Sequence, residues 1–257
     1  NCDCWHTLCY YYDIIRSQGK GGNPMNKHEL DEMLAENPFL VLSDVIYQSL
    51  YNDIIQLKMP PDSRLNESKI AEELGISRSP VKSALSKLEK DGLVYKKSGK
   101  ILAVSWMTKE DGYSLYEARS ALEGFAASLA VIRITAEQMK ELEELTRQYV
   151  AVCNGSNKEL NPNDYADIDH KFHSLIVTAS CNPYIMRMYR SLEGYLLHYR
   201  YCLYYSLGPE KLQRILYQAG KRHQAIFNAF QMGFTDIVRH EVEEDVHSML
   251  NAFNQWE

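Results

Sequence analysis

The stretch from Leu65 to Val104, LNESKIAEELGISRSPVKSALSKLEKDGLVYKKSGKILAV, restricts most strongly what this chain can fold into. Asn66 can cap a first short helix that Gly75 ends, because a short polar side chain accepts from free backbone N–H groups and glycine tolerates a left-handed conformation. The pair Ser79-Pro80 predicts the start of a second helix, which ends at Asp91-Gly92. Two short helices joined by a three-residue turn form a helix-turn-helix, whose second helix enters the DNA major groove.

The second helix has a polar face suited to DNA. Arg78 and Lys82 fall on that face, and Ser77 lies near its N-terminal end, where hydroxyls and backbone amides can contact phosphates. Residues 93–95 and 101–104 predict two strands around a turn rich in lysine. A basic hairpin beside a helix-turn-helix is typical of a wing, although an ordinary small α/β unit with solvated lysines would show the same hairpin.

The string from Pro60 through Val104 resembles the winged-helix domain of the GntR family of bacterial transcription regulators. The resemblance rests on Leu65-Asn66-Glu67, on the turn and helix start at residues 74–82, and on the last part of the family signature, from Leu88 to Leu93. It implies that Arg78 and Lys82 read bases; the lysine stands where the family usually has arginine and lacks the bidentate fork. The complete expected DNA-binding set is Lys69, Ser77, Arg78, Ser79, Lys82, Lys97, Gly99 and Lys100.

Charge is distributed unevenly along the 257 residues, whose formal net charge is −6. Residues 41–107 hold 10 Lys and Arg against 8 Asp and Glu, whereas residues 108–257 hold 15 against 20. The excess in the first segment is a weak electrostatic footprint for a polyanion. We therefore expect two copies to bind one duplex, as a homodimer on a palindromic double-stranded operator.

The N-terminal residues and the cysteines suggest no extra functional module. The chain has six cysteines, three near the start and three scattered among the predicted helices. This distribution favours reduced thiols in a cytoplasmic protein. The spacing of Cys2, Cys4, His6 and Cys9 fits no usual zinc finger. Lys20-Gly21-Gly22 could be encoded by a purine-rich ribosome-binding sequence just before Met25, so we hypothesise that residues 1–24 are translated leader.

Most of the remaining chain has a helical apolar period, and no run approaches the length of a membrane span. Residues 42–57 predict one helix behind the helix-turn-helix, which Pro60-Pro61 ends. The fold class expected is mainly α, with residues 1–40 as an extension, 41–107 as a winged helix-turn-helix, and 108–254 as an all-α antiparallel bundle. The expected bundle helices are 108–133, 136–153, 163–180, 183–206, 209–232 and 234–253.

Several polar residues interrupt the apolar period of the bundle. Asp169 and His173 are four residues apart and therefore lie on one helical face, beside an apolar stripe that includes Phe172. His223 and Asp245 lie in two other predicted helices, and bundle cores build metal sites from such combinations. The alternative is a set of scattered surface residues, since eight histidines produce an i, i+4 pair by chance.

The bundle resembles the FCD effector domain of the FadR branch of GntR regulators. Arg119, the Asp169 to His173 pair, the Asn182-Pro183 break, and His223 ten residues before Gly233 carry that resemblance. It implies a divalent metal, often Zn²⁺ or Ni²⁺, held by one aspartate and three histidines, with a small carboxylate effector completing the shell.

By that resemblance the metal ligands are Asp169, His173, His223 and Asp245, the last standing where a histidine is usual. A second carboxylate makes the site harder and favours Zn²⁺, Mn²⁺ or Mg²⁺. His247 points about 200° away from Asp245 on an ideal helix and is a poor substitute. Arg119 is the implied partner of the effector carboxylate, and the alternative is an ion pair with Glu123 at i+4.

Together these features predict a metabolite-responsive transcription regulator, a repressor rather than an enzyme, that contacts no membrane. A rival from another class is a metal-dependent hydrolase with an accessory DNA-binding module. Such a site needs a placed general base, and no carboxylate is marked out by motif for that role. A second rival is a ligand-free architectural protein that uses the bundle only to dimerise.

Overall fold

The computed structural model describes residues 26–37, 39–55, 57–59, 61–99, 101–105, 108–154, 162–206 and 209–253. Its contacts divide the chain between residues 107 and 108 into two compact units. Helix dominates and a small sheet accompanies it, which confirms the predicted fold class. The hypothesis about residues 1–24, the N-terminal cysteines and Lys100 lie outside the described residues.

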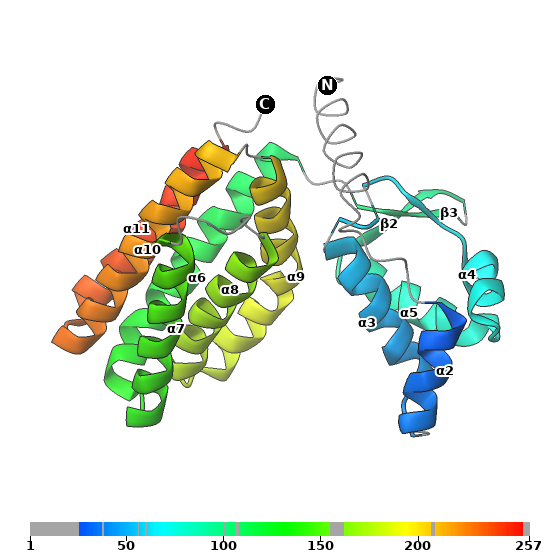
Figure 1. Cartoon of the computed structure of the whole chain (residues 1–257), viewed down its shortest axis with the longest axis horizontal. Coiled ribbons are helices and arrows are strands. Elements are labelled where there is room, and N and C mark those ends of the chain that lie inside the picture. The colour runs from blue at the N-terminus through cyan, green and yellow to red at the C-terminus, as the bar shows by residue number, and fades with distance from the viewer. Residues whose placement is uncertain are drawn as a thin grey trace. The chain divides into compact units, whose positions relative to one another are not determined.

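The first unit consists of four described helices and a three-stranded sheet (Figure 1). The side chain of Asn26 and that of Glu29 form a capping box at the start of the first of these helices. The helix-turn-helix packs on the long helix before it through buried Val81, Leu85 and Leu88. The helices are α2 (Lys27–Glu36), α3 (Leu42–Ile55), α4 (Glu67–Leu74) and α5 (Arg78–Lys90).

The helix-turn-helix forms largely as its residues dictate, with one correction. The Asn66 side chain accepts from the amides of Ser68 and Lys69, and Gly75 ends α4 at φ +67°, both as predicted. The start at Ser79 is wrong, because α5 already begins at Arg78 after an extended Ser77. Pro80 is tolerated inside the first turn, where backbone N–H groups have no partner within the helix.

The wing is a sheet in the order β1-β3-β2, and both pairings are antiparallel. Its central strand, β3 (Ile101–Val104), pairs with β2 (Val94–Ser98) as the hairpin pattern predicts. The third strand, β1 (Arg64–Leu65), is only two residues long and therefore has no readable period in the sequence. Pairing of Arg64 with Ala103 ties the segment before α4 to the wing.

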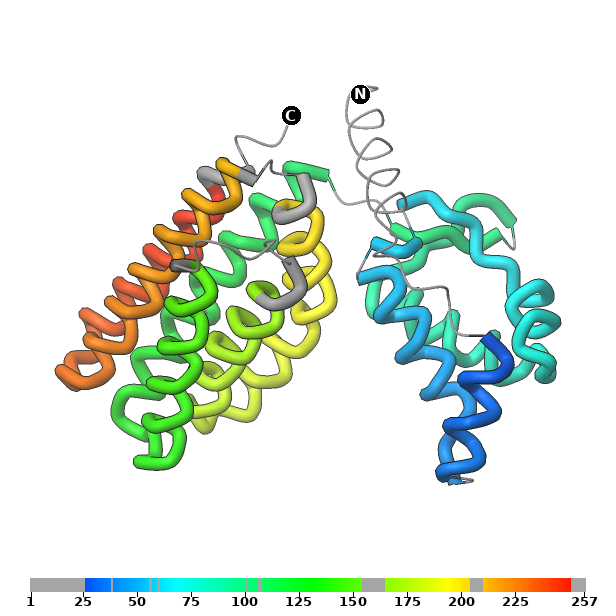
Figure 2. Tube along the Cα trace, in the orientation of Figure 1, coloured from blue at the N-terminus to red at the C-terminus, as the bar shows by residue number. Residues whose placement is uncertain are grey.

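The second unit is an all-helical bundle. Helix α8 packs against α6, α7 and α9, while α11 lies along α6 and α10 packs on α7 and α11. The trace in Figure 2 shows these helices running up and down beside one another, with α9 on the opposite side from α10 and α11. The bounds are α6 (Lys109–Arg133), α7 (Ala136–Asn154), α8 (Pro162–Ala179), α9 (Pro183–Ser206), α10 (Pro209–Met232) and α11 (Thr235–Phe253).

One part of the bundle core is an apolar cluster that includes residues of α8. Phe172 and Ile176 of this helix are buried against Ile226 of α10 and Val242 of α11. Burial of side chains of this size stabilises the bundle by about 1.5–3 kcal/mol each. Among the described helices, none is both long enough and apolar enough to cross a membrane.

Candidate functional site

The exposed face of α5 collects the residues predicted to meet DNA. Its opposite face is buried, so Arg78, Ser79 and Lys82 are directed to solvent, with exposed Ser77 at the N-terminal end. Within the described residues Arg78 and Lys82 form no ion pair. Both cations are therefore available to a polyanion without first separating from an acidic partner.

Two of the predicted phosphate-binding lysines, Lys69 and Lys97, are different, because each is paired with a carboxylate. Lys97 forms an ion pair with Asp62, which also accepts a hydrogen bond of 2.7 Å from the Tyr95 hydroxyl. Lys69 lies 3.6 Å from Glu73 one turn later on α4. Gly99 is exposed at the wing tip with φ +56°, a conformation that glycine adopts without strain.

Three buried side chains in the bundle meet closely enough to hold a metal ion. Asp169 and His173 come from α8 and His223 from α10, and one ligand atom of each lies within 4.8 Å of the others. The Nε2 atom of His223 is 3.3 Å from Oδ1 of Asp169, and Nε2 of His173 is 3.9 Å from the same oxygen. All three are buried, so the alternative of scattered surface residues does not hold.

Asp245 of α11 is directed toward the same place. Its Oδ2 atom lies 3.2 Å from Nε2 of His173 and 3.9 Å from Nε2 of His223. Ligand atoms bound at about 2.0–2.1 Å in a tetrahedron are about 3.3 Å apart, which is close to these separations. The Nε2 atoms of His173 and His223 are buried and have no hydrogen-bond partner among the described residues, and the carboxylates of Asp169 and Asp245 are buried beside them. This donor set fits a divalent cation.

His247 takes no part in this cluster. Its side chain is exposed, and Nδ1 lies 2.7 Å from the backbone oxygen of Glu243 and 3.4 Å from the Ser120 hydroxyl. The helical rotation between positions 245 and 247 places the two side chains on different faces, as the spacing predicts.

A second layer of polar contacts surrounds the four residues. Nδ1 of His173 is 2.8 Å from Oε2 of Glu123, and Oε1 of Glu123 is 2.6 Å from Nε of Arg119. The ion pair that the sequence left as the alternative for Arg119 is thus present. It occupies Nε and, at 3.4 Å, Nη2 of the guanidinium, and the described contacts do not include Nη1.

Sequence reasoning missed a third buried cation, Arg200 of α9. Its Nη2 pairs with Oδ2 of Asp169, and its Nη1 donates to the backbone oxygen of Ala166 at 3.3 Å. Oδ1 of Asp169 is left facing the two histidines. The only available signal was an arginine inside the hydrophobic and aromatic run LLHYRYCLYY, and a single arginine of that kind does not indicate what it pairs with.

These charges shift the ionisation of the cluster strongly. Burial alone would raise the pKa of Glu123, but Arg119 and His173 outweigh it and lower that pKa to about 2. Burial is likewise outweighed at Asp169, where Arg200 and His173 hold the pKa well below its usual range. Burial lowers the pKa of His173, yet Glu123 and Asp169 raise it to about 9. Without a metal, Glu123 and Asp169 are therefore ionised, and His173 carries a proton.

Aromatic rings close the cluster on the other side. Phe172 stacks on His223 with ring centroids 4.1 Å apart, and Tyr149 lies 4.2 Å from the same imidazole. The ring of His223 is fixed between them, so its Nε2 atom faces the carboxylates. This packing pre-organises one ligand without using a hydrogen bond.

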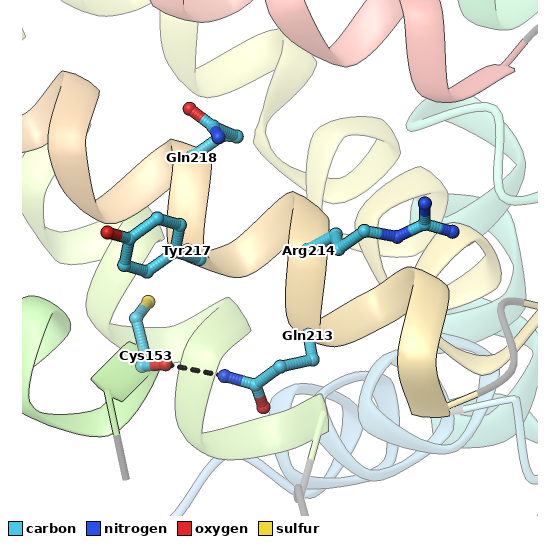
Figure 3. Close-up of a pocket in the computed structure, with 5 residues that line it drawn as sticks. All are labelled: Cys153, Gln213, Arg214, Tyr217 and Gln218. Carbon is cyan, nitrogen blue, oxygen red and sulfur yellow. Dashed lines mark hydrogen bonds between the residues drawn. The ribbon is translucent and has the colours of Figure 1, made fainter. Parts of the chain in front are cut away.

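A surface pocket of about 500 Å³ opens nearby between α7 and α10 (Figure 3). In it Gln213 donates to the backbone oxygen of Cys153 at 2.7 Å, while Arg214 and Tyr217 are exposed. Burial raises the pKa of the Cys153 thiol to about 12, with a further contribution from the Asp169 carboxylate. This thiol is therefore neutral at pH 7, and Cys153 is not among the described residues whose ligand atoms converge in the cluster.

A winged helix-turn-helix joined to an all-helical bundle defines a class of protein, the two-domain DNA-binding transcription regulators. Comparison with known families agrees. Residues 42–104 match the gntR family of bacterial regulatory proteins, and residues 114–247 match the FCD domain. The chain belongs to the GntR family and carries an FCD domain. It is therefore a DNA-binding transcription regulator and not an enzyme.

Individual relatives are similar over most of their length. The chain is 29% identical over 182 residues to the HTH-type transcriptional regulator YdhC of Bacillus subtilis, covering 70% of this chain and 77% of that protein. It is 24% identical over 231 residues to the repressor RspR of Escherichia coli, covering 86% and 95%. The solved structure of E. coli McbR/YncC shares the fold, with TM-score 0.68 at 21% identity, covering 84% and 99%.

Proposed function

We propose that this protein is a metal-containing repressor that binds a palindromic operator as a homodimer and responds to a small organic acid. The observation that carries the proposal is the buried convergence of Asp169, His173, His223 and Asp245 inside the bundle of a DNA-binding regulator. Such a cluster is costly to bury unless it is paired or coordinates a ligand. Its site of action would be the cytoplasm, where the operator DNA is found.

In this proposal α5 lies in the major groove. Arg78 reads a base edge with its planar fork, Lys82 supports it, and Ser77 and Ser79 contact phosphates at the helix N-terminus. Lys69, Lys97, Gly99 and Lys100 would follow the backbone, and Lys97 would exchange Asp62 for a phosphate. Each base contact of this kind is worth about 1–3 kcal/mol of discrimination.

The bundle would hold Zn²⁺, with Ni²⁺, Mn²⁺ or Mg²⁺ as the other candidates. When bound, the ion supplies a Lewis-acidic position to which a carboxylate can attach. Nη1 of Arg119 offers that carboxylate a second contact, since the described contacts of the guanidinium use its other nitrogens. A ligand changes operator affinity only by binding one conformation better than another, and about 1–3 kcal/mol of coupling is typical.

Two neighbouring helices suggest where the copies would meet. Helices α6 and α9 pack together. The end of α6 lies near the start of α9, as the hydrogen bond from Arg133 to the backbone oxygen of Ser180 shows. Both present exposed apolar side chains near that end. These are Phe125 at 48% and Ile132 at 74% exposure on α6, and Tyr184 at 70% and Met188 at 59% on α9.

Charge complementarity favours a second copy on this surface, which we call the α6/α9 face. Exposed Arg187 and Arg190 lie near the start of α9, and exposed Glu110 and Glu117 lie toward the start of α6, at the other end of the antiparallel pair. A two-fold axis across the helices would bring the acidic end of one copy beside the basic end of the other. Both copies would thereby cover their apolar residues.

The direction of regulation is proposed from relatives. RspR and GlaR of E. coli are named repressors, whereas the Glc operon protein of the same organism is named an activator. Repression agrees with RspR, 95% of whose length is covered. A reporter fused to the native promoter should rise when the gene is deleted, and a fall would reverse the assignment.

One experiment tests DNA, metal and effector together. Binding to the chain's own promoter fragment is measured against random duplex, with and without EDTA, across a series of small carboxylates, and the unfolding temperature of the protein is measured under the same conditions. We expect specific binding to the promoter fragment, a higher unfolding temperature on adding Zn²⁺, and a further increase with one acid. Arg78→Ala should relax base preference while preserving the Zn²⁺ shift. Equal affinity for promoter and random duplex under every condition would refute the proposal.

A further inference from the structure

The strongest feature that the proposed function leaves unused is a continuous chain of buried contacts from Arg119 to His173. Arg119 and Glu123 share one face of α6, and the carboxylate of Glu123 lies between the guanidinium and the imidazole of α8. The separations are 2.6 Å from Nε of Arg119 to Oε1 and 2.8 Å from Oε2 to Nδ1 of His173. All three side chains are buried.

We propose that Glu123 is a positioning residue that fixes which nitrogen of His173 faces the metal, and that Arg119 acts on the metal through it. This inference rests on the proposed metal site. Because Nδ1 faces the Glu123 carboxylate at 2.8 Å, the imidazole presents Nε2 toward Asp169 and Asp245. A carboxylate behind a ligand histidine fixes the ring and strengthens its remaining nitrogen as a donor.

The two ligand histidines are oriented by different means, which makes the role of Glu123 specific. His223 is held by stacking on Phe172, and among the described residues no carboxylate pairs with its Nδ1, whereas Glu123 lies 2.8 Å from Nδ1 of His173. His173 meets Phe172 only edge-on, with centroids 5.4 Å apart. Loss of Glu123 should therefore release the ring of His173 and leave that of His223 in place.

The same chain couples the two proposed ligands. A carboxylate bound at Arg119 contacts the group that holds Glu123, and Glu123 holds His173. An effector would therefore change metal affinity even if it never touched the ion. Because coupling between two binding equilibria is reciprocal, the metal would change effector affinity by the same factor.

The test compares Glu123→Gln with Glu144→Gln, each in the full chain. Glu144 also pairs with an arginine on its own helix, Arg147, but that pair is exposed. Zn²⁺ affinity is measured by competition with a chromophoric chelator. We expect roughly 10- to 100-fold weaker binding for Glu123→Gln and no change for Glu144→Gln. A Glu123→Gln protein that binds Zn²⁺ as tightly as the wild type would overturn the inference.

A spectroscopic readout separates positioning from charge. Histidine-selective NMR of the Zn²⁺-loaded protein should show a downfield Nδ1 proton of His173, identified by its loss in His173→Gln. In Glu123→Gln this signal should move upfield and exchange faster with water, because a neutral amide accepts more weakly. Weaker Zn²⁺ binding with an unmoved signal would mean that Glu123 acts by charge alone, and positioning would be wrong.

Two further variants complete the design. Glu123→Asp keeps the charge but withdraws the carboxylate by one methylene, so it should lose Zn²⁺ affinity too, and it replaces the Gln variant if that protein fails to fold. Arg119→Gln should weaken Zn²⁺ binding in the wild type and have little further effect in Glu123→Gln. If the losses of Zn²⁺ affinity in the two single variants were additive in the double variant, Arg119 would act independently of Glu123, and the proposed coupling would be wrong. A wild type whose Zn²⁺ affinity equals that of His223→Ala would instead refute the metal site itself.

Discussion

At the scale of single residues, the buried charges of the bundle are matched unusually closely. Asp169 meets Arg200, Glu123 meets Arg119, and His173 lies between two carboxylates. Removing one member would leave an uncompensated buried charge, which costs about 3–5 kcal/mol. Replacing one proposed metal ligand by another polar side chain should therefore cost less stability than removing one member of a buried ion pair.

Metal binding should release a proton from His173. Its pKa of about 9, raised chiefly by Glu123 against the effect of burial, keeps the ring protonated at pH 7.5, and a metal binds only the neutral imidazole. Zn²⁺ affinity should therefore rise with pH up to about 9 and level off above it. Calorimetry at pH 7.5 in two buffers of different ionisation enthalpy should report about one proton released from this residue. Release that is unchanged in His173→Gln would contradict this origin.

Asp245→His should change which metal the site prefers. An imidazole is a softer donor than a carboxylate, so the affinity for Zn²⁺ over Mn²⁺ should increase by about tenfold or more. Competition between the two ions, followed by metal analysis of the dialysed protein, measures that ratio. Asp236→His on the exposed first turn of α11 is the matched control and should leave the ratio unchanged.

At the scale of elements, periodicity predicted where helices lie and spacing predicted which ligands share a face. The six bundle helices match because glycine, proline and asparagine mark their ends, as at Asn182-Pro183 and Gly233. The two-residue strand β1 and the partner of Arg200 were not predictable, because both depend on contacts between segments far apart in the sequence. Likewise, only the fold reveals that Asp62 pairs with the wing lysine.

The ion pair between Asp62 and Lys97 should weaken phosphate binding by the wing. Asp62→Asn removes the carboxylate charge beside Lys97, while the amide oxygen can still accept from Tyr95 and asparagine tolerates the φ of +66° found there. Freed from its partner, Lys97 should bind phosphate more strongly, by about two- to fivefold for all sequences alike. Gel shifts with operator and random duplex at several salt concentrations measure this. A gain confined to the operator would show that the wing reads sequence.

At the scale of the whole molecule, the weakly basic DNA-binding unit makes dimerisation decisive. Residues 41–107 exceed neutrality by only two positive charges, so one copy would hold a duplex weakly. In the proposed dimer, two copies joined through the bundle would add a second recognition helix at a high local concentration. Mutations in the bundle should therefore change DNA affinity without touching DNA.

Met188→Glu tests this link between assembly and DNA binding. In the α6/α9 face this side chain is 59% exposed in one copy and would be buried in the dimer, where a carboxylate without a partner is costly. Because the face is shared by both copies, each dimer carries the substitution twice, and dimer affinity should fall by at least about tenfold. Sedimentation equilibrium gives the dimer constant, and operator gel shifts give its consequence. Met232→Glu, equally exposed at the end of α10 and away from that face, should change neither. If Met188→Glu stays dimeric, the copies associate through another surface, and operator affinity should then be unaffected as well.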